Sequence, residues 1–161
     1  MFNKKTKTVI ITGGNSGLGY ACAKELARKK NYYLVLACRN KKKATKVIKK
    51  LKQLTSNNQI EAMSLDLASL KSVRQFASEF IHRKLPPLRG IICNAGVQFI
   101  QQRKYTEDGF ETTFAVNHLG HFLLVNLLVK HLTAPGRIIF VSSDTHDPEK
   151  ITGMPAPNFQ N

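Results

Sequence analysis

The sequence predicts a doubly wound α/β fold built on a parallel sheet, and three observations lead to this fold class. Five short apolar runs alternate with four longer segments in which apolar residues recur at helical spacing. The runs are almost continuously apolar, as in parallel strands that are covered by helices on both faces. A glycine-rich turn separates the first run from the first helical segment. Because crossovers in such sheets are right-handed, the expected strand order is 3-2-1-4-5.

The expected elements follow one another over residues 1–161 without repeats or an internal domain boundary. The strands are expected at residues 9–11, 33–37, 60–65, 88–93 and 137–141. The first helix follows the glycine turn, the second carries seven lysines between residues 41 and 52, and Ser69 is a suitable N-cap for the third. The fourth is expected to start at Thr106-Glu107-Asp108, where acids suit a first turn, and to end at about residue 132.

The composition limits the possible classes of protein. With 161 residues, of which 42% are hydrophobic, the chain can form one domain with a sizeable core. No apolar run approaches the ~20 residues of a membrane span, and the apolar stretch near the N-terminus is too short for a signal peptide. The three cysteines, Cys22, Cys38 and Cys93, are widely separated and fit no zinc spacing. We therefore expect buried thiols, no metal site and a reducing, cytoplasmic location.

The net charge of +15 raises the question of a nucleic-acid partner. The seven lysines between residues 41 and 52 alternate with apolar residues at helical spacing, so one face of that helix packs and the other is solvated. No aromatic residue lies among these lysines to stack on bases. A solvated helix face is therefore favoured over a nucleic-acid or membrane surface, and no nucleic-acid partner is expected.

The glycine-rich turn is the first candidate site. Its spacing is Gly13-x-x-x-Gly17-x-Gly19, which differs from the commoner G-x-G-x-x-G. A strand, a glycine turn and a helix in this order are typical of a dinucleotide-binding (Rossmann) site, because glycine allows close approach of a pyrophosphate to unpaired N–H groups at the helix N-terminus. An ordinary glycine-rich connection between strand and helix is the alternative.

The residues that end the predicted strands should meet in one crevice. They are Gly13, Arg39, Asp66, Asn94 and Ser143. In doubly wound sheets, ligands bind beyond the carboxyl ends of the strands, near the switch point between strands 1 and 4.

Arg39 predicts the preferred cofactor. It ends the second strand, where an acidic residue would bind the ribose hydroxyls of NAD, and its guanidinium instead suits the 2′-phosphate of NADP. Asn40 could assist. A surface arginine beside the lysine-rich helix is the alternative interpretation.

Two polar residues are expected within the apolar stripe of the fourth helix. Residues of this stripe are Phe110, Phe114, Asn117, His121, Leu124 and Leu128. A buried Asn117 would need hydrogen-bond partners, either as a functional residue or as a core asparagine. His121 is interpreted as a packing or hydrogen-bonding residue rather than a ligand. Ser143 could face a bound carbonyl or could simply be a turn residue.

Together these motifs resemble the short-chain dehydrogenase/reductase family, most closely its retinol dehydrogenase and protochlorophyllide reductase-like branch. The matching motifs are Thr12-Gly13-x-x-x-Gly17-x-Gly19, Asp66-Leu67, Asn94-Ala95-Gly96, and Asn117 followed by Ser143 after a strand. The resemblance implies an NADP(H)-dependent oxidoreductase that acts on a carbonyl, an alcohol or a similar apolar small molecule. It also implies a possible homo-oligomer.

The resemblance assigns roles to these residues. The cofactor-binding residues of the turn would be Gly13, Asn15, Ser16, Gly17, Leu18 and Gly19. The adenine would meet Asp66 and Leu67, and the nucleotide and its ribose would lie against Asn94, Ala95 and Gly96. Ser143 would hydrogen-bond the substrate, and Asn117 would hold a water of the proton relay.

The sequence departs from the family after Ser143. The family's general acid/base is the tyrosine of a Tyr-x-x-x-Lys motif downstream of this serine, but no tyrosine follows Ser143 here, and Lys150 is the only later lysine. The family's last two strands are missing as well. We therefore expect one NADP-binding domain that stops before this motif and is inactive alone. The alternative is a non-catalytic nucleotide-binding or partner-binding module.

Overall fold

The computed structural model describes residues 5–99 and 102–143 and confirms a parallel five-stranded sheet with the order β3-β2-β1-β4-β5. The strands are β1 (Lys7–Thr12), β2 (Tyr32–Cys38), β3 (Ile60–Ser64), β4 (Leu88–Cys93) and β5 (Leu132–Phe140). The α-helices are α1 (Gly17–Arg28), α2 (Lys41–Thr55), α3 (Leu70–His82), α4 (Thr112–Phe114) and α5 (Gly120–Leu128). A π-helical turn, η1 (Ala115–Leu119), joins α4 to α5, and a 3₁₀ turn, η2 (Val129–His131), precedes β5.

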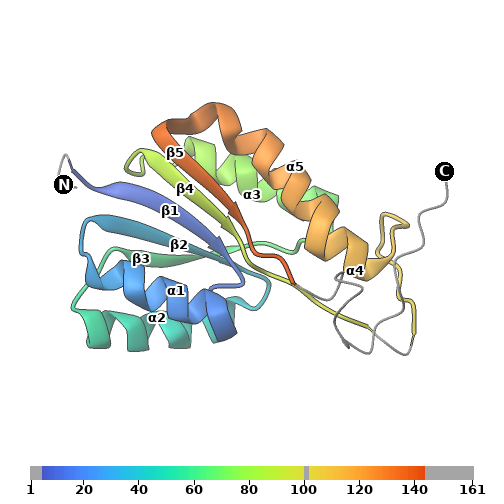
Figure 1. Cartoon of the computed structure of the whole chain (residues 1–161), viewed down its shortest axis with the longest axis horizontal. Helices are drawn as coiled ribbons and strands as arrows, with labels where there is room; N and C mark the ends of the chain where they lie inside the picture. Colours follow the sequence, from blue (N-terminus) through green and yellow to red (C-terminus); the bar gives the residue numbers. More distant parts are fainter. Residues whose placement is uncertain (1–4, 100–101, 144–161) are drawn as a thin grey trace.

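The sheet separates two apolar cores because successive strand residues point to opposite faces. Figure 1 shows α1 and α2 on one face, with α3 and α5 on the other. Within β1, Val9 and Ile11 pack in the core under α1 and α2, whereas Ile10 packs under α3 and α5. The almost continuous apolar runs of the sequence thus reflect strands that are buried on both faces.

Side-chain caps fix the starts of α2 and α3. The Asn40 Oδ1 accepts a hydrogen bond from the Lys43 N–H at 2.8 Å, and the Ser69 Oγ accepts one from the Ser72 N–H at 3.3 Å. The predicted N-cap at Ser69 is therefore confirmed. Six of the seven lysines of α2 are exposed and Lys52 is half-buried, as expected for a solvated helix face.

The fourth helical segment begins later than predicted. Its first helical residue is Thr112, and the Glu111 carboxylate accepts hydrogen bonds from the N–H groups of Thr113 and Phe114 at 2.8 and 2.7 Å. These bonds lower the pKa of Glu111. Asp108, which was expected in the first turn of this helix, instead accepts a hydrogen bond from the N–H of Leu70 at 2.8 Å. The acidic residues therefore cap two helices rather than start one.

The predicted apolar stripe of this segment is wrong in its first half. His121 and Leu124 are buried as expected, but Phe114 is 50% exposed and Asn117 is exposed, while Val116 is buried. The cause is the π-helical turn, in which the N–H of Gly120 bonds to the carbonyl of Ala115 and one extra residue enters the turn. Because of this extra residue, the side chains before the turn, such as that of Phe114, point to a different face of the helix than a regular 3.6-residue period predicts.

The segment Thr112–His131 is long and apolar enough to cross a membrane by length and composition, with a mean hydropathy of 1.3. An apolar stretch of this length was not expected from the sequence. The core helix of a globular protein can have the same length and composition. In this structure the segment covers one face of the sheet beside α3 (Figure 1).

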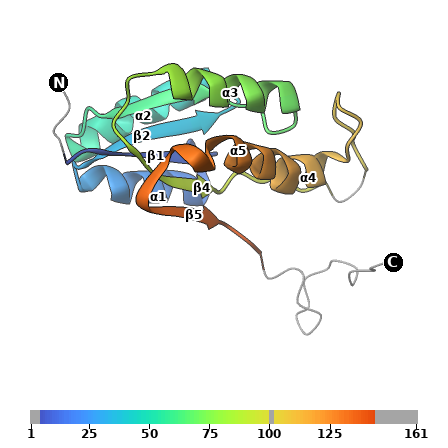
Figure 2. The same cartoon turned by 90° about the horizontal axis from the view of Figure 1, so that it is seen from above.

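The strand β5 lies at the edge of the sheet, beside β4 (Figure 2). It begins at Leu132, five residues before the predicted start, and its register with β4 shifts between the pairs Leu88–Leu132 and Gly90–Arg137. On this strand Ile139 is 47% exposed and Phe140 is 58% exposed. The sheet therefore ends in an edge strand with exposed apolar side chains.

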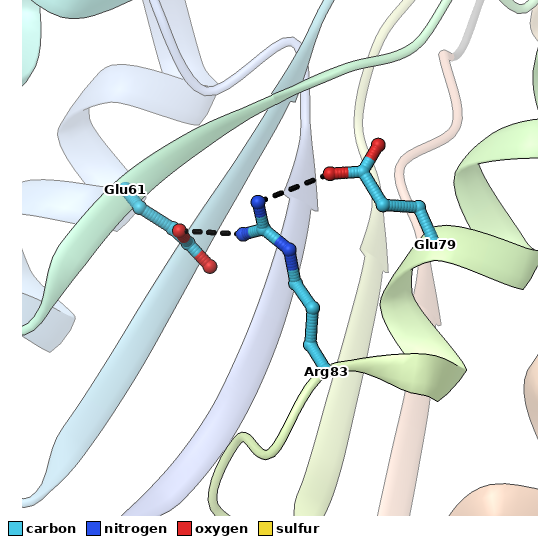
Figure 3. Close-up of polar contacts among 3 residues, drawn as sticks. All are labelled: Glu61, Glu79 and Arg83. Carbon is cyan, nitrogen blue, oxygen red and sulfur yellow. Dashed lines mark hydrogen bonds and ion pairs between the residues drawn. The ribbon is translucent and has the colours of Figure 1, made fainter.

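An ion-pair cluster ties the end of α3 to β3 at the opposite edge. Figure 3 shows Arg83 between Glu61 and Glu79, with N–O distances of 2.7 and 3.0 Å. Burial, followed by the neighbouring Glu61 carboxylate, raises the pKa of Tyr33 to about 12. This corner of the molecule is closed by polar contacts, in contrast to the edge at β5.

Candidate functional site

A cavity of about 640 Å³ opens at the carboxyl ends of β1, β2, β3 and β4. It is lined by Gly13, Asn15, Ser16, Gly17, Leu18, Ala37, Cys38, Arg39, Asn40, Lys43, Leu65, Asp66, Leu67, Asn94, Ala95, Gly96, Val97 and Val116. Twelve of the thirteen predicted cofactor-binding residues are in this group, and Gly19 is not. The structure therefore brings the predicted cofactor residues together at the switch point of the sheet.

The N-terminus of α1, which follows the glycine turn, borders this cavity with Ser16, Gly17 and Leu18. Gly13 and Gly17 adopt φ of +66° and +54°, which side chains with a Cβ rarely adopt. Ser16 is the N-cap of α1, yet its side chain makes no capping hydrogen bond, and the first turn carries no acid. The helix N-terminus thus combines unpaired N–H donors with the positive end of the helix dipole. This combination suits an anion such as a pyrophosphate.

Gly19 is needed for packing rather than for access to the cavity. A Cβ on Gly19 would lie 2.5 Å from the Nδ2 of Asn94 and 2.7 Å from the carbonyl oxygen of Gly13. These distances are too short for any side chain. The third glycine of the motif therefore lets α1 approach the glycine turn and the end of β4.

Two cations lie where the cavity meets the end of β2. Arg39 was expected there, but Lys43, which lies one turn into α2, was counted only among the solvated lysines. Because Lys43 lies one turn after the Asn40 cap, its place in the sequence could have identified it as a second cation of the site. Asn40 also lines the cavity, but its Oδ1 is occupied in capping α2, so only its remaining amide hydrogens are available for a ligand.

The third strand supplies an acid and an apolar wall. The Asp66 Oδ1 accepts a hydrogen bond from the N–H of Ala68 at 3.0 Å, which fixes the carboxylate beside the cavity. Leu67 is buried, with 6% of its surface exposed. A carboxylate next to an apolar side chain can bind the edge and the face of a planar heterocycle.

Thr12 organises the wall formed after β4. Its Oγ1 accepts hydrogen bonds from the N–H groups of Asn94 and Ala95, both at 2.9 Å, and the Asn94 Nδ2 donates to the Thr12 carbonyl at 3.0 Å. These bonds join the ends of β1 and β4 directly behind the glycine turn. This role of Thr12 was not predicted from the sequence, in which the residue only precedes the glycines of the motif.

The two predicted catalytic residues lie outside the cavity lining. Asn117 is exposed in η1, where its Oδ1 accepts from the N–H of Val97 at 2.8 Å and its Nδ2 donates to the Val97 carbonyl at 2.9 Å. Its expected burial is wrong, but it does have partners and holds a loop that lines the cavity. Ser143 is exposed three residues beyond β5. The described residues therefore do not bring Ser143 into the cofactor cleft.

His121 is fully buried and hydrogen-bonded, as its interpretation predicted. Its Nε2 lies 2.8 Å from the Thr12 Oγ1 and its Nδ1 lies 3.3 Å from the Asn117 carbonyl oxygen. Burial lowers the pKa of His121, and this effect exceeds the opposing effect of the hydrogen bond to Asn117.

The cysteines carry free thiols, and Cys38 lines the cavity. Burial raises the pKa of Cys38 to about 11, although hydrogen bonds from the backbone of Asn15 and Gly14 act in the opposite direction. Cys93 is also buried, whereas Cys22 is only half-buried, which corrects the expectation of three buried thiols. Cys38 is therefore a neutral part of the cavity wall.

Other lining residues were missed because they carry no distinctive chemistry. They are Ala37, Leu65, Val97 and Val116. Each lies at a strand end or faces one, so the predicted topology is the signal that could have found them.

Comparisons with known proteins agree with this geometry. The family model for short chain dehydrogenases matches residues 7–154. Human retinol dehydrogenase 13 is 48% identical over 142 residues, and human polyprenol dehydrogenase is 46% identical over 146 residues. Each alignment covers 87% of this chain but only 42% and 43% of those proteins, respectively. The chain thus spans less than half the length of these relatives.

Solved structures show the same fold. An uncharacterised protein from Mycobacterium paratuberculosis is 40% identical with a TM-score of 0.73, over 86% of this chain and 47% of that protein. An alcohol dehydrogenase from the archaeon Thermococcus sibiricus, solved with 5-hydroxy-NADP, is 26% identical with a TM-score of 0.65, over 78% of this chain and 53% of that one. With the glycine turn, the strand order and the family model in agreement, the chain belongs to the short-chain dehydrogenase/reductase family.

Proposed function

We propose that this chain forms the NADP(H)-binding part of a short-chain oxidoreductase. The observation that carries the proposal is the pairing of an uncapped helix N-terminus with two cations in one cleft. The first suits the pyrophosphate of a dinucleotide and the second suits a 2′-phosphate. The alcohol dehydrogenase that resembles this chain and was solved with 5-hydroxy-NADP supports the same cofactor class.

The charges of the cleft favour NADP over NAD. Arg39 can form two parallel hydrogen bonds to a phosphate, and Lys43 adds a second positive charge at the same end of the cavity. Asp66 is the one acidic residue in the described cavity lining, and it follows β3 rather than β2. A carboxylate at the end of β2 would be needed to favour the unphosphorylated ribose.

When bound, the nicotinamide would give hydride to a carbonyl or take it from an alcohol. Ser143 is proposed to hydrogen-bond the reacting oxygen and Asn117 to hold a water of the proton relay, although neither lines the described cleft. The names of the relatives, polyprenol and retinol dehydrogenases, support an apolar alcohol or carbonyl compound as the substrate class.

The proton donor is not provided by residues 1–161 in the family's usual place. No tyrosine follows Ser143 in the sequence. We propose that a Tyr-x-x-x-Lys motif completes the enzyme in the whole protein. We also propose that the whole protein works in a reducing compartment such as the cytoplasm and forms a homo-oligomer. The exposed position of Ser143 also supports the second candidate, a nucleotide-binding module without catalysis.

The cofactor preference can be measured by titrating NADPH and NADH into the full-length protein. The wild-type protein should prefer NADPH, and Arg39→Asp should reverse this preference, because a lost charged hydrogen bond costs on the order of 1.5–3 kcal/mol. Lys43→Gln should weaken NADPH binding and leave NADH binding nearly unchanged.

Lys49→Glu is the matched control for Arg39→Asp. Lys49 is exposed on α2 and does not line the cavity, so the same change in charge should alter both affinities only slightly. Equal affinity for NADPH and NADH in the wild-type protein and in Arg39→Asp would exclude Arg39 from the binding site.

A further inference from the structure

His121 connects two segments that border the cofactor cleft, although it does not line the cavity itself. Its side chain comes from α5, and only 2% of its surface is exposed. One ring nitrogen meets Thr12 at the end of β1, and the other meets the Asn117 carbonyl in η1. A buried imidazole that joins a strand end to a π-helical turn is not needed for apolar packing alone, since a leucine would fill similar space.

The hydrogen-bond count at Thr12 fixes the direction of the first contact. A hydroxyl oxygen has one hydrogen and accepts two hydrogen bonds. Both acceptor positions of the Thr12 Oγ1 are used by the N–H groups of Asn94 and Ala95, at 2.9 Å each. Its hydrogen can then go to the His121 Nε2 at 2.8 Å or to the Ile92 carbonyl at 3.4 Å. The shorter contact makes the Nε2 an acceptor.

The second contact follows from the first. An imidazole whose Nε2 accepts a hydrogen bond is neutral and carries its hydrogen on Nδ1. The Nδ1–H therefore donates to the Asn117 carbonyl at 3.3 Å. The Asn117 side chain in turn bonds to both backbone groups of Val97, which lines the cavity. One neutral ring thus supports the cavity wall through Thr12 and through Asn117.

We propose that His121 is a positioning residue of the cofactor cleft: its neutral ring accepts the Thr12 hydroxyl hydrogen and so directs both Thr12 lone pairs at the N–H groups of Asn94 and Ala95. Without the ring nitrogen, the hydroxyl hydrogen keeps only the more distant Ile92 carbonyl oxygen at 3.4 Å as an acceptor, and the wall behind the glycine turn is held less firmly. The effect of His121 on cofactor affinity rests on the proposed function, whereas its effect on the wall does not.

The test uses paired substitutions in the full-length protein. His121→Leu removes both ring nitrogens, and His121→Gln returns an acceptor near the position of the Nε2. Thr12→Val removes the hydroxyl at nearly constant shape, and Thr12→Ser restores it. His131→Gln is the control, because His131 is exposed in η2 and lines no part of the cofactor cavity.

Amide hydrogen exchange, measured without cofactor, reports directly on the hydrogen bonds of the Asn94 and Ala95 N–H groups. His121→Leu should speed exchange at Asn94 and Ala95 about three- to tenfold relative to Ile10 in the middle of β1, as expected for one lost neutral hydrogen bond. Thr12→Val removes the acceptor of both N–H groups and should speed their exchange more. His121→Gln and Thr12→Ser should restore most of the protection. The double variant Thr12→Val/His121→Leu should exceed Thr12→Val only slightly, since His121 acts on these N–H groups through the Thr12 hydroxyl.

Cofactor titration gives the second readout. The NADPH dissociation constant should rise in His121→Leu and rise further in Thr12→Val, with the NADPH-to-NADH preference unchanged in both. His131→Gln should match the wild-type protein. Unchanged exchange at Asn94 and Ala95 in His121→Leu would overturn the proposal. Exchange that is as fast in His121→Gln as in His121→Leu would overturn it as well. A wild-type protein that does not bind NADPH would refute the proposed function, while the exchange experiment would still decide this inference.

A further variant covers the case in which His121→Leu does not fold. His121→Asn keeps a donor near the Nδ1 position but cannot reach Thr12, so exchange at Asn94 and Ala95 should be faster than in His121→Gln, although slower than in Thr12→Val. Protection equal to that of His121→Gln would contradict the proposed acceptor role of the Nε2.

Discussion

The β1–β2–β3 side of the sheet and its β5 edge differ in how completely this chain covers them. On the first side, helices bury both faces, and residues such as Ile10, Leu34 and Leu36 have no exposed surface. At the other edge, Ile139, Phe140 and Val141 are 47%, 58% and 47% exposed. The cofactor residues lie on the covered side, whereas Ser143 follows the open edge. The described residues therefore suffice to build a cofactor cleft but not a substrate site around Ser143.

The largest expected effect is on turnover, which needs the region around Ser143, whereas cofactor binding needs only the covered side. Residues 1–161 alone should bind NADPH but show no hydride transfer at a family-like rate, since no tyrosine follows Ser143 to act as proton donor. In the full-length protein, Ser143→Ala should lower turnover by about 100-fold and change NADPH affinity little. Absorbance of NADPH at steady state and its equilibrium titration give the two quantities. Robust turnover by residues 1–161 would show that the proton donor lies within them.

Gly19→Ala should destabilise the covered side of the sheet. The new Cβ would meet the carbonyl oxygen of Gly13 and the side chain of Asn94, so the glycine turn must shift. We expect a loss of about 1–3 kcal/mol in the free energy of unfolding, together with weaker NADPH binding. Urea denaturation and titration measure both.

Gly90→Ala provides the comparison for this variant. Gly90 is also buried, but its Cβ would lie 3.4 Å from the nearest atom, in the Val9 side chain, and far fewer adjustments would follow. Equal effects of the two substitutions would contradict a special role for Gly19.

Ile139→Lys tests the open edge. An exposed apolar edge strand can pair with another chain, so we propose that residues 1–161 self-associate despite their net charge. A lysine at this half-exposed position should make the chain more nearly monomeric while changing the free energy of unfolding by less than about 1 kcal/mol. Light scattering gives the mass. Thr133→Lys adds the same charge at an exposed polar residue of β5 and should leave association largely unchanged. A monodisperse monomer of the unsubstituted residues 1–161 would contradict the proposal.

The smallest expected effect is a pH dependence on the covered side. Burial lowers the pKa of His121 in the folded chain, so the unfolded chain binds a proton first as the pH falls. The free energy of unfolding should therefore decrease below about pH 6.5, by at most about 1.4 kcal/mol per pH unit from this residue. His121→Gln should have a shallower slope than the wild-type protein in urea denaturation between about pH 7.5 and 5. Parallel slopes would mean that His121 takes up its proton equally in both states.

Several features of the cleft follow from short-range patterns in the sequence. The turn from Gly13 to Gly19 lies between an apolar strand and a helix, so its position at the switch point follows from the strand order alone. Arg39 and Asp66 end strands, and parallel strands place such residues at one edge of the sheet. The cap at Ser69 is local in the same sense, because its partner is three residues away.

The tertiary structure decided what depends on packing between distant residues. A π-helical turn, which no residue pattern announced, moved Asn117 to the surface and set Val116 against the cleft. Asp108 caps α3, and Thr12 meets His121 from the other end of the chain. The sequence by itself determined the fold class and the cofactor-binding edge, since strands, turns and caps depend on neighbours along the chain. Only the folded structure decided which polar groups face one another, because each of those contacts requires two elements to be packed first.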